Sequence, residues 1–229
     1  MVPQNPPPAL PRFLILTLAT FLFLVSGGYA EEIQVGSKTL SIVPPEGYCV
    51  LDHNNPADAF VMDTVQKAQA GHGLVLMHFV LCTELDDWHA GRAPGYSHYG
   101  NTSVQRQDGT PHTFRISLPE FIAEMQKHMP EIDMAEIERE VNGKVEGIEL
   151  SGSQVLGVIG KDSNALYVGL ASAVEAEGQQ TLLAGVTSFT LLGSFIANTN
   201  LTAPAEPGAH ERLLVAQKAY LAELVRLNS

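Results

Sequence analysis

The chain has 229 residues, 45% of them hydrophobic, with 13 lysines and arginines against 25 aspartates and glutamates, which gives a formal net charge of −12. Such an acidic surface repels phosphate backbones and anionic lipid head groups, so we expect no nucleic acid or membrane surface as a partner. The length and the apolar content suit one domain with a substantial core.

The N-terminal segment has the pattern of a signal peptide. Residues 1–12 contain one basic residue, Arg12, and no acid, and they lead into an uncharged run from Phe13 to Val25. A helix of that length covers about 20 Å, less than the ~30 Å hydrocarbon core of a bilayer. Gly28 and Ala30 are the small residues that a signal peptidase requires, so we predict a signal peptide over residues 1–30. The alternative is an uncleaved N-terminal anchor.

Cleavage after Ala30 would leave 12 basic and 25 acidic residues, a formal charge of −13. We therefore predict an exported protein, periplasmic or secreted, with a single α+β domain over residues 31–229. A second uncharged stretch, Thr181 to Leu201, is too rich in threonine, serine and asparagine for a transmembrane helix. We therefore expect no stable membrane span in the mature chain.

The mature chain begins with short strands and a helix. Residues 33–43 alternate around Gly36-Ser37 as two strands, and the prolines and glycine of residues 44–47 predict an extended turn. The segment Asn55-Pro56-Ala57-Asp58 predicts a helix start, with an N-cap acceptor, a proline and an acid in the first turn. This helix is expected to reach about residue 70, and its apolar side would carry Phe60, Val61, Val65 and Ala68.

The apolar run from Leu74 to Cys82 predicts a buried central strand. Cys82 and Cys49 are the two cysteines of the chain, and in an oxidising compartment such a pair predicts a disulfide. The bond would close a loop of about 34 residues and stabilise the fold by roughly 3 to 4 kcal/mol. The alternatives are two buried free thiols or a reactive thiol. We interpret His78, within the strand, as a hydrogen-bonded sheet residue rather than a ligand.

The segment after this strand gathers polar and aromatic residues that could form a site. Thr83 with Asp86 predicts the start of a helix over residues 83–90, and residues 91–112 predict a loop with one exposed strand near 99–105. Carboxylates and imidazoles ligate zinc or copper or act as an acid and base pair, and the metal candidates are Asp86, Asp87, His89 and His98. The ligand-binding candidates are Trp88, Tyr96 and Tyr99. The alternative is a solvated helix start followed by a surface loop.

Helices and then strands are predicted for the rest of the chain. Ser117 with Glu120 is a capping box for a helix to about Met129, and a second helix over Asp133 to Val141 completes a helical insertion near 117–142. Four strands follow, over residues 154–160, 165–174, 182–192 and 195–203, before a helix over about 210–227. Consecutive strands with short turns pair antiparallel. We therefore predict an α+β fold, a mostly antiparallel sheet with helices packed on its faces and a C-terminal helix after a long hairpin.

Two stretches resemble a known family. The segment GVTSFTLLGSFIANTNLTAP followed by LLVAQKAYLAELVRLN resembles the end of PsbP-like α-β-α sandwich proteins, and LSIVPPEGYCVLD resembles the start of such domains. The chain is also similar to small exported proteobacterial proteins without an assigned function. The resemblance implies an accessory or binding role and no catalytic residues, and the helices near 117–142 would be an addition to the family's pattern.

The sequence contains no GxSxG, HExxH, CxxC, phosphate-binding loop or EF-hand pattern, so no catalytic residue is assigned. We therefore expect a non-enzymatic exported accessory or binding protein, with a protein or a small molecule as its partner and no cofactor. The alternative is a metal-binding protein or a metal-dependent enzyme that uses the region from Asp86 to His98 with zinc or copper.

Overall fold

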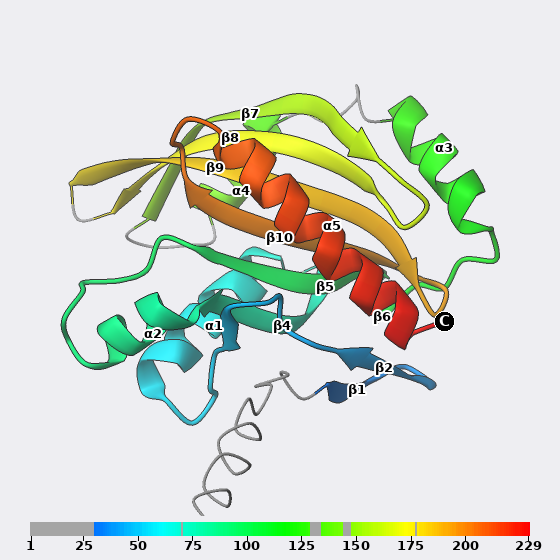
Figure 1. Cartoon of the computed structure of the whole chain (residues 1–229), viewed down its shortest axis with the longest axis horizontal. Helices are drawn as coiled ribbons and strands as arrows, with labels where there is room; N and C mark the ends of the chain where they lie inside the picture. Colours follow the sequence, from blue (N-terminus) through cyan, green and yellow to red (C-terminus); the bar gives the residue numbers. More distant parts are fainter. Residues whose placement is uncertain (1–29, 70, 129–133, 144–147, 177) are drawn as a thin grey trace, which may run out of the picture.

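The computed structural model of the chain describes residues 30–69, 71–128, 134–143, 148–176 and 178–229 (Figure 1). Apart from Ala30, the predicted signal peptide lies outside the described residues. Within these ranges, no helix has both the length and the apolar character that crossing a membrane requires.

The central sheet has the strand order β3-β4-β5-β10-β9-β8-β7, with β6 attached to β5. Every neighbouring pair is antiparallel, so the fold is α+β with a mostly antiparallel sheet, as predicted. The strands are β3 (Tyr48–Val50), β4 (Gly73–Leu81), β5 (Tyr99–Gln107), β6 (Thr110–Pro111), β7 (Ile148–Lys161), β8 (Leu166–Ala176), β9 (Gln179–Leu192) and β10 (Phe195–Pro204). A separate hairpin of β1 (Glu31–Val35) and β2 (Lys38–Ile42) precedes them.

Strand β5 joins the two halves of the sheet, because it pairs with β4 on one edge and with β10 on the other. Residues 100–104 of β5 are buried. The predicted strand near residues 99–105 is therefore present, but the prediction that it is exposed is wrong. The polar sequence of β5 suggested exposure, whereas its pairing on both edges places it in the interior of the sheet.

Helix α1 (Pro56–Ala68) begins as predicted, since the side chain of Asn55 accepts a hydrogen bond from the backbone N–H of Ala57 at 3.0 Å. Its buried residues are Asp58 and Met62. Phe60 is 70% exposed, so the predicted apolar side is wrong at this position. The helix turns Asp58 inward because that carboxylate binds other groups in the interior, as described below.

Helix α2 (Cys82–His89) follows β4 directly and has Leu81 as its N-cap residue. No side chain caps this helix, so the predicted capping role of Thr83 is wrong. Cys82 is bonded to Cys49 with an S–S distance of 2.04 Å, which confirms the predicted disulfide. The bond ties β3, the first strand in the sheet order, to the start of α2.

Helices α3 (Leu118–His128) and α4 (Met134–Asn142) connect β6 to β7. The predicted capping box is present, because the Glu120 carboxylate accepts hydrogen bonds from the backbone N–H and the hydroxyl of Ser117 at 2.9 and 2.7 Å. Phe121 and Ile122 of α3 are buried in an apolar cluster with Leu166, Val168 and Ile196 of the sheet. This helix therefore belongs to the packed interior of the fold.

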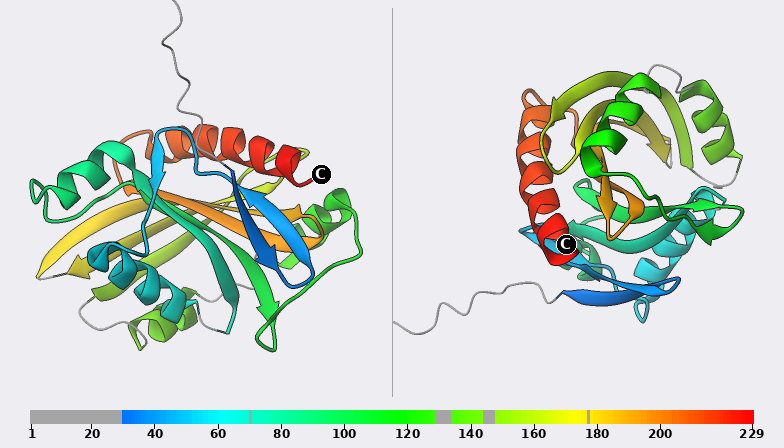
Figure 2. Two further views of the ribbon diagram at one scale, coloured as in Figure 1. Left: turned by 90° about the horizontal axis from the view of Figure 1, so that it is seen from below. Right: turned by 90° about the vertical axis from the view of Figure 1, so that its right-hand side faces the viewer.

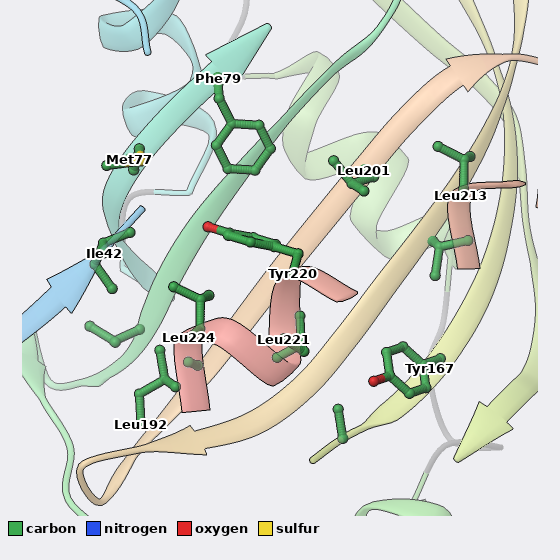
Figure 3. Close-up of a cluster of buried hydrophobic side chains, with 14 of the residues drawn as sticks. Ile42, Met77, Phe79, Tyr167, Leu192, Leu201, Leu213, Tyr220, Leu221 and Leu224 are labelled. Atoms are coloured by element: carbon green, nitrogen blue, oxygen red, sulfur yellow. The ribbon is translucent and has the colours of Figure 1, made fainter. Parts of the chain in front are cut away.

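Helix α5 (Ala209–Leu227) runs across one face of the sheet (Figure 1). Its residues Tyr220, Leu221 and Leu224 point toward the sheet and contribute to the main core (Figure 3). The rings of Tyr220 and Phe79 meet edge to face at 5.6 Å, and the Tyr220 hydroxyl lies 2.7 Å from the hydroxyl of Thr102. In the rotated views, α1 and α4 lie on the other side of the sheet from α5 (Figure 2).

Candidate functional site

The face of the sheet opposite α5 contains a group of polar side chains from three neighbouring strands. Side chains along a strand alternate between the two faces. In β10, Ala197, Leu201 and Ala203 belong to the core under α5, so Asn198 and Asn200 lie on the opposite face. The strand register then forms two rows across the sheet, Asn101-Asn200-Thr187 and Ser103-Asn198-Phe189 from β5, β10 and β9.

Two apolar clusters flank these rows on the same face. One contains Phe121 and Ile122 of α3 and extends to Ile196, which precedes Asn198 by two residues in β10. The other contains Met62 of α1, Leu85 of α2 and Val80 of β4 and extends to Tyr99, which pairs with Thr202. The polar rows thus occupy a gap between two sets of helices that cover the ends of this face.

The gap forms a cleft of about 300 Å³, which we call the polar cleft. Among its described lining residues, none is an aspartate, glutamate, lysine or arginine. The lining consists of Gln69, His72, Gly73, Asn101, Ser103, Gln105, Thr187, Phe189, Asn198, Thr199 and Asn200. The cleft therefore offers amide and hydroxyl groups, one imidazole and one aromatic ring.

Several polar groups in the cleft have unused hydrogen-bonding capacity. Asn101 and Ser103 are only 9% and 4% exposed, yet neither side chain has a hydrogen-bond partner among the described residues. The Oδ1 atom of Asn198 is buried and is likewise without a partner in this part of the chain. Buried polar groups in folded proteins are usually hydrogen-bonded, so the buried Oδ1 of Asn198, next to the unpartnered side chains of Asn101 and Ser103, indicates a place for a ligand.

Asn200 is held in place by the neighbouring strand. Its Oδ1 atom accepts a hydrogen bond from the backbone N–H of Asn101 at 2.7 Å. This contact fixes the side chain beside Asn101 and leaves the Asn200 amide N–H groups without a partner among the described residues.

His78 lies next to the polar rows, opposite Asn101 in the register of β4 and β5. It is 7% exposed, and burial, with a smaller effect of the His53 charge, lowers its pKa from 6.5 to about 4. The imidazole is therefore neutral near pH 7. His78 is a buried residue of the sheet, as predicted, and no hydrogen-bond partner of its ring lies within the described ranges.

The four metal candidates predicted from the sequence have separate surroundings. His89 Nε2 lies 2.6 Å from Oδ1 of Asp58, and Asp87 forms an ion pair with Arg92 at 2.7 Å. His98 Nδ1 lies 2.6 Å from the carboxylate of Glu84, whereas Asp86 is exposed. Across the described parts of the chain, no three histidine, cysteine, aspartate or glutamate side chains are grouped so that they could hold a metal ion. The zinc or copper site stays a prediction.

Glu84, which the sequence analysis did not select, holds the end of the loop between α2 and β5. Its carboxylate accepts hydrogen bonds from the backbone N–H groups of Ser97 and His98 at 2.7 and 2.8 Å, and from the Ser97 hydroxyl at 3.0 Å. Burial alone would raise the pKa of Glu84, but these hydrogen bonds outweigh it and lower the pKa. The carboxylate thus fixes the chain just before β5.

Asp58 has a similar structural role at the start of α1. It is fully buried, and its Oδ2 atom accepts a hydrogen bond from the backbone N–H of Asp52 at 2.9 Å. Its other oxygen contacts His89 of α2. The carboxylate thereby links the turn before α1 to the end of α2.

The three aromatic candidates pack against one another. The rings of Trp88 and Tyr96 are 5.1 Å apart and those of Tyr96 and Tyr99 are 6.0 Å apart, in edge-to-face arrangements. All three pack against the buried cluster of Leu51, Met62, Val80 and Leu85. Burial raises the pKa of both tyrosines, so they stay neutral. Their arrangement supports the wall of the fold beside the cleft, and a ligand contact stays a prediction.

The fold and the cleft together define an α+β protein with an uncharged, hydrogen-bonding site on the face of its sheet. No protein-family model matches the chain, and no curated protein matches it in sequence.

Sequence reasoning missed the polar rows. A signal was present, because Asn198 and Asn200 lie two positions apart in β10 between Ala197 and Leu201. In β5, Asn101 and Ser103 have the same spacing between Gly100 and Val104. Alternating asparagines in a strand with a buried opposite face indicate a polar face. The polar sides of β5 and β10 form one site only because these two strands pair with each other.

Proposed function

We propose that this is an exported, non-enzymatic binding protein that holds a small uncharged ligand rich in hydroxyl groups, such as a sugar unit, in the polar cleft. The observation on which this rests is the buried, unpartnered Oδ1 atom of Asn198, which lies beside the side chains of Asn101 and Ser103 that have no hydrogen-bond partner among the described residues. A buried polar group without a partner costs roughly 1–3 kcal/mol. A ligand that supplies the partners would recover this free energy on binding.

The cleft disfavours ions, because its described lining contains no aspartate, glutamate, lysine or arginine. An ionised ligand would lose hydration on entering and would find no side chain of opposite charge among the described lining residues. His78, next to the cleft, is neutral near pH 7 because of its lowered pKa. The site therefore suits an uncharged molecule.

The groups in the cleft match hydroxyl chemistry. An asparagine amide both donates and accepts, as a hydroxyl group does, so each asparagine can bind one or two sugar hydroxyls. The ring of Phe189 stands in the same row as Ser103 and Asn198 and supplies an apolar surface for the C–H groups of a sugar ring. The volume of about 300 Å³ lies at the lower end of the range for small-molecule sites, which favours a single ring over a long chain.

The disulfide supports export. Disulfides persist in the periplasm and outside the cell and are rare in the cytosol. The bond between Cys49 and Cys82 is therefore compatible with the signal peptide expected over residues 1–30. An accessory role like that implied by the PsbP-like resemblance is part of this proposal, since helices pack on both faces of the sheet.

The proposal is tested by titrating the purified protein with neutral monosaccharides and disaccharides in a calorimeter, with glucose 6-phosphate and glucuronate as charged controls. Asn198→Leu removes the central amide and keeps a similar shape, and we expect it to weaken sugar binding at least tenfold. Thr202→Val is the matched control, because Thr202 lies on the same face of β10 but outside the cleft.

Two results would contradict the proposal. One is binding of the charged sugars alone, because the cleft has no group to compensate their charge. The other is equal sugar affinity in the wild type and the Asn198→Leu variant, which would place the sugar elsewhere on the protein.

A further inference from the structure

A second concave surface lies on the opposite side of the molecule, between α5 and the turn that joins β2 to β3. Its volume is about 790 Å³, and we call it the α5 groove. Its apolar lining consists of Val43, Pro44, Pro45, Val215, Ala216 and Ala219. Val215 is 70% exposed, which is unusual for a valine on a helix that packs on a core.

The apolar surface of the groove continues the packed face of α5. Tyr220 lines the groove and also packs against Phe79 in the main core. The small side chains of Ala216 and Ala219 sit between it and Val215, so they leave room for apolar side chains of a partner. Exposed apolar concavities bordered by polar residues are typical of protein interaction sites.

The backbone of the groove restricts how a partner can bind. Pro44 and Pro45 have no backbone N–H, and the carbonyl of Pro45 already accepts a hydrogen bond from Tyr48 at 3.0 Å. The backbone groups of α5 are used within the helix itself. Among the described lining residues outside α5, only Val43 and Glu46 have a backbone N–H, too few to pair with an added strand, so a partner must bind through its side chains, as an amphipathic helix does.

The border of the groove is acidic. Glu46, Glu211 and Glu223 line it with a single base, Arg212. Arg212 pairs with Glu206 and Glu223 pairs with Arg226, whereas Glu46 and Glu211 have no ion-pair partner within the described ranges. A partner with basic residues beside its apolar face would complement these two charges. A second copy of this chain, with its net charge of −12, would not.

From the apolar lining, the small number of backbone N–H groups that it offers and the acidic border, we propose that the α5 groove binds a basic amphipathic helix of another protein. The leucine-like anchors of that helix lie against Val215 and Ala219, and its lysine or arginine side chains reach Glu46 and Glu211. This interaction is independent of the polar cleft, because the two surfaces lie on opposite faces of the sheet.

The proposal is tested with two synthetic helical peptides in a fluorescence anisotropy titration. Both have leucine along one face, and the other face is lysine in one peptide and glutamate in the other. We expect the protein without its predicted signal peptide, residues 31–229, to bind the lysine peptide at least tenfold more tightly than the glutamate peptide. Ala219→Trp fills the groove and should weaken this binding at least tenfold, whereas Ala57→Trp, at an exposed position of α1 on the other side of the sheet, should leave it unchanged.

Charge reversal provides the second variant. Glu211 is exposed in the first turn of α5, so we expect the fold to tolerate Glu211→Lys. The variant should bind the lysine peptide more weakly and the glutamate peptide more tightly than the wild type does. The proposal is overturned if Ala219→Trp and Ala57→Trp bind the lysine peptide equally, since attraction to the acidic surface as a whole would then explain the binding. Equal affinity for the two peptides would also overturn it.

Discussion

Asn200 of β10 accepts a hydrogen bond through its side-chain oxygen from the backbone N–H of Asn101 in β5, at 2.7 Å. The contact spans the junction between the two halves of the sheet, which are distant in sequence. It places two asparagines side by side on the face away from α5, where Ser103 and Asn198 follow in the next row. The same pairing that completes the sheet therefore builds the polar cleft.

The buried side-chain oxygen of Asn198 should lower the stability of the protein without ligand. Asn198→Leu replaces an unpartnered acceptor by an apolar group of similar shape. We expect its free energy of unfolding, measured by urea denaturation without ligand, to rise by about 1 kcal/mol. Thr202→Val on the same face should change it less. A clear loss of stability in Asn198→Leu would mean that this amide has a structural partner and is not reserved for a ligand.

Gly100 should not tolerate a side chain. A Cβ atom there would lie 2.1 Å from the backbone oxygen of Asn200 and 2.5 Å from the ring of Phe79. We expect Gly100→Ala to reduce the free energy of unfolding by about 3 kcal/mol or more, because both neighbours lie in the packed sheet. Gly95→Ala is the control, since an added Cβ there has no atom within 4 Å. Similar stability of the two variants would show that β5 does not lie this close to β10.

The disulfide should stabilise the fold. Replacing Cys49 and Cys82 by alanine removes a link between residues that are 33 positions apart. We expect a loss of roughly 3 kcal/mol in the free energy of unfolding. Addition of dithiothreitol should reproduce most of this loss in the wild type and have no effect on the double variant. If dithiothreitol did not change the free energy of unfolding of the wild type, the result would argue against the bond.

His78 should make stability depend on pH. Its pKa is about 4 in the folded protein, against an ordinary value of 6.5. Between these values the unfolded chain binds a proton that the folded protein does not, so stability is lost as the pH decreases from 6.5 toward 4. We expect His78→Gln to show a smaller loss over this range in urea denaturation at pH 7, 6 and 5. Parallel curves for the two proteins would refute a buried neutral His78.

His53 offers a check on the cause of this shift. Its charge is the smaller of the two causes, after burial. His53→Gln should therefore raise the pKa of His78 only in part, which an NMR titration of the imidazole would detect. A return of the pKa to 6.5 in this variant would show that burial is not the main cause.

Much of the fold was predictable because its signals are local. The strands and turns of residues 148–204, the capping box at Ser117 and the N-cap at Asn55 follow from residues close together in the sequence. Strand β5 was harder, since its buried Asn101, Thr102 and Ser103 have the composition of a surface segment. Its central place depends on pairing with β10, a contact between residues almost one hundred positions apart.

The candidate site was not predictable for the same reason. The residues from Asp86 to His98 attracted attention because polar groups are dense there. In the structure, His89 and His98 contact carboxylates, Asp58 and Glu84, that belong to the local architecture. The polar rows come from three strands. Of these, β9 and β10 form the predicted hairpin, whereas nearby residues do not specify the pairing of β5 with β10.

Binding of a neutral sugar in the polar cleft can be observed directly. The most direct measurement is an NMR titration that follows the side-chain amide signals of Asn101, Asn198 and Asn200 while the tightest-binding sugar of the panel is added. We predict that these three pairs of signals shift together and saturate at the calorimetric affinity. Saturable binding that leaves all three unchanged, with shifts confined to other parts of the protein, would contradict it.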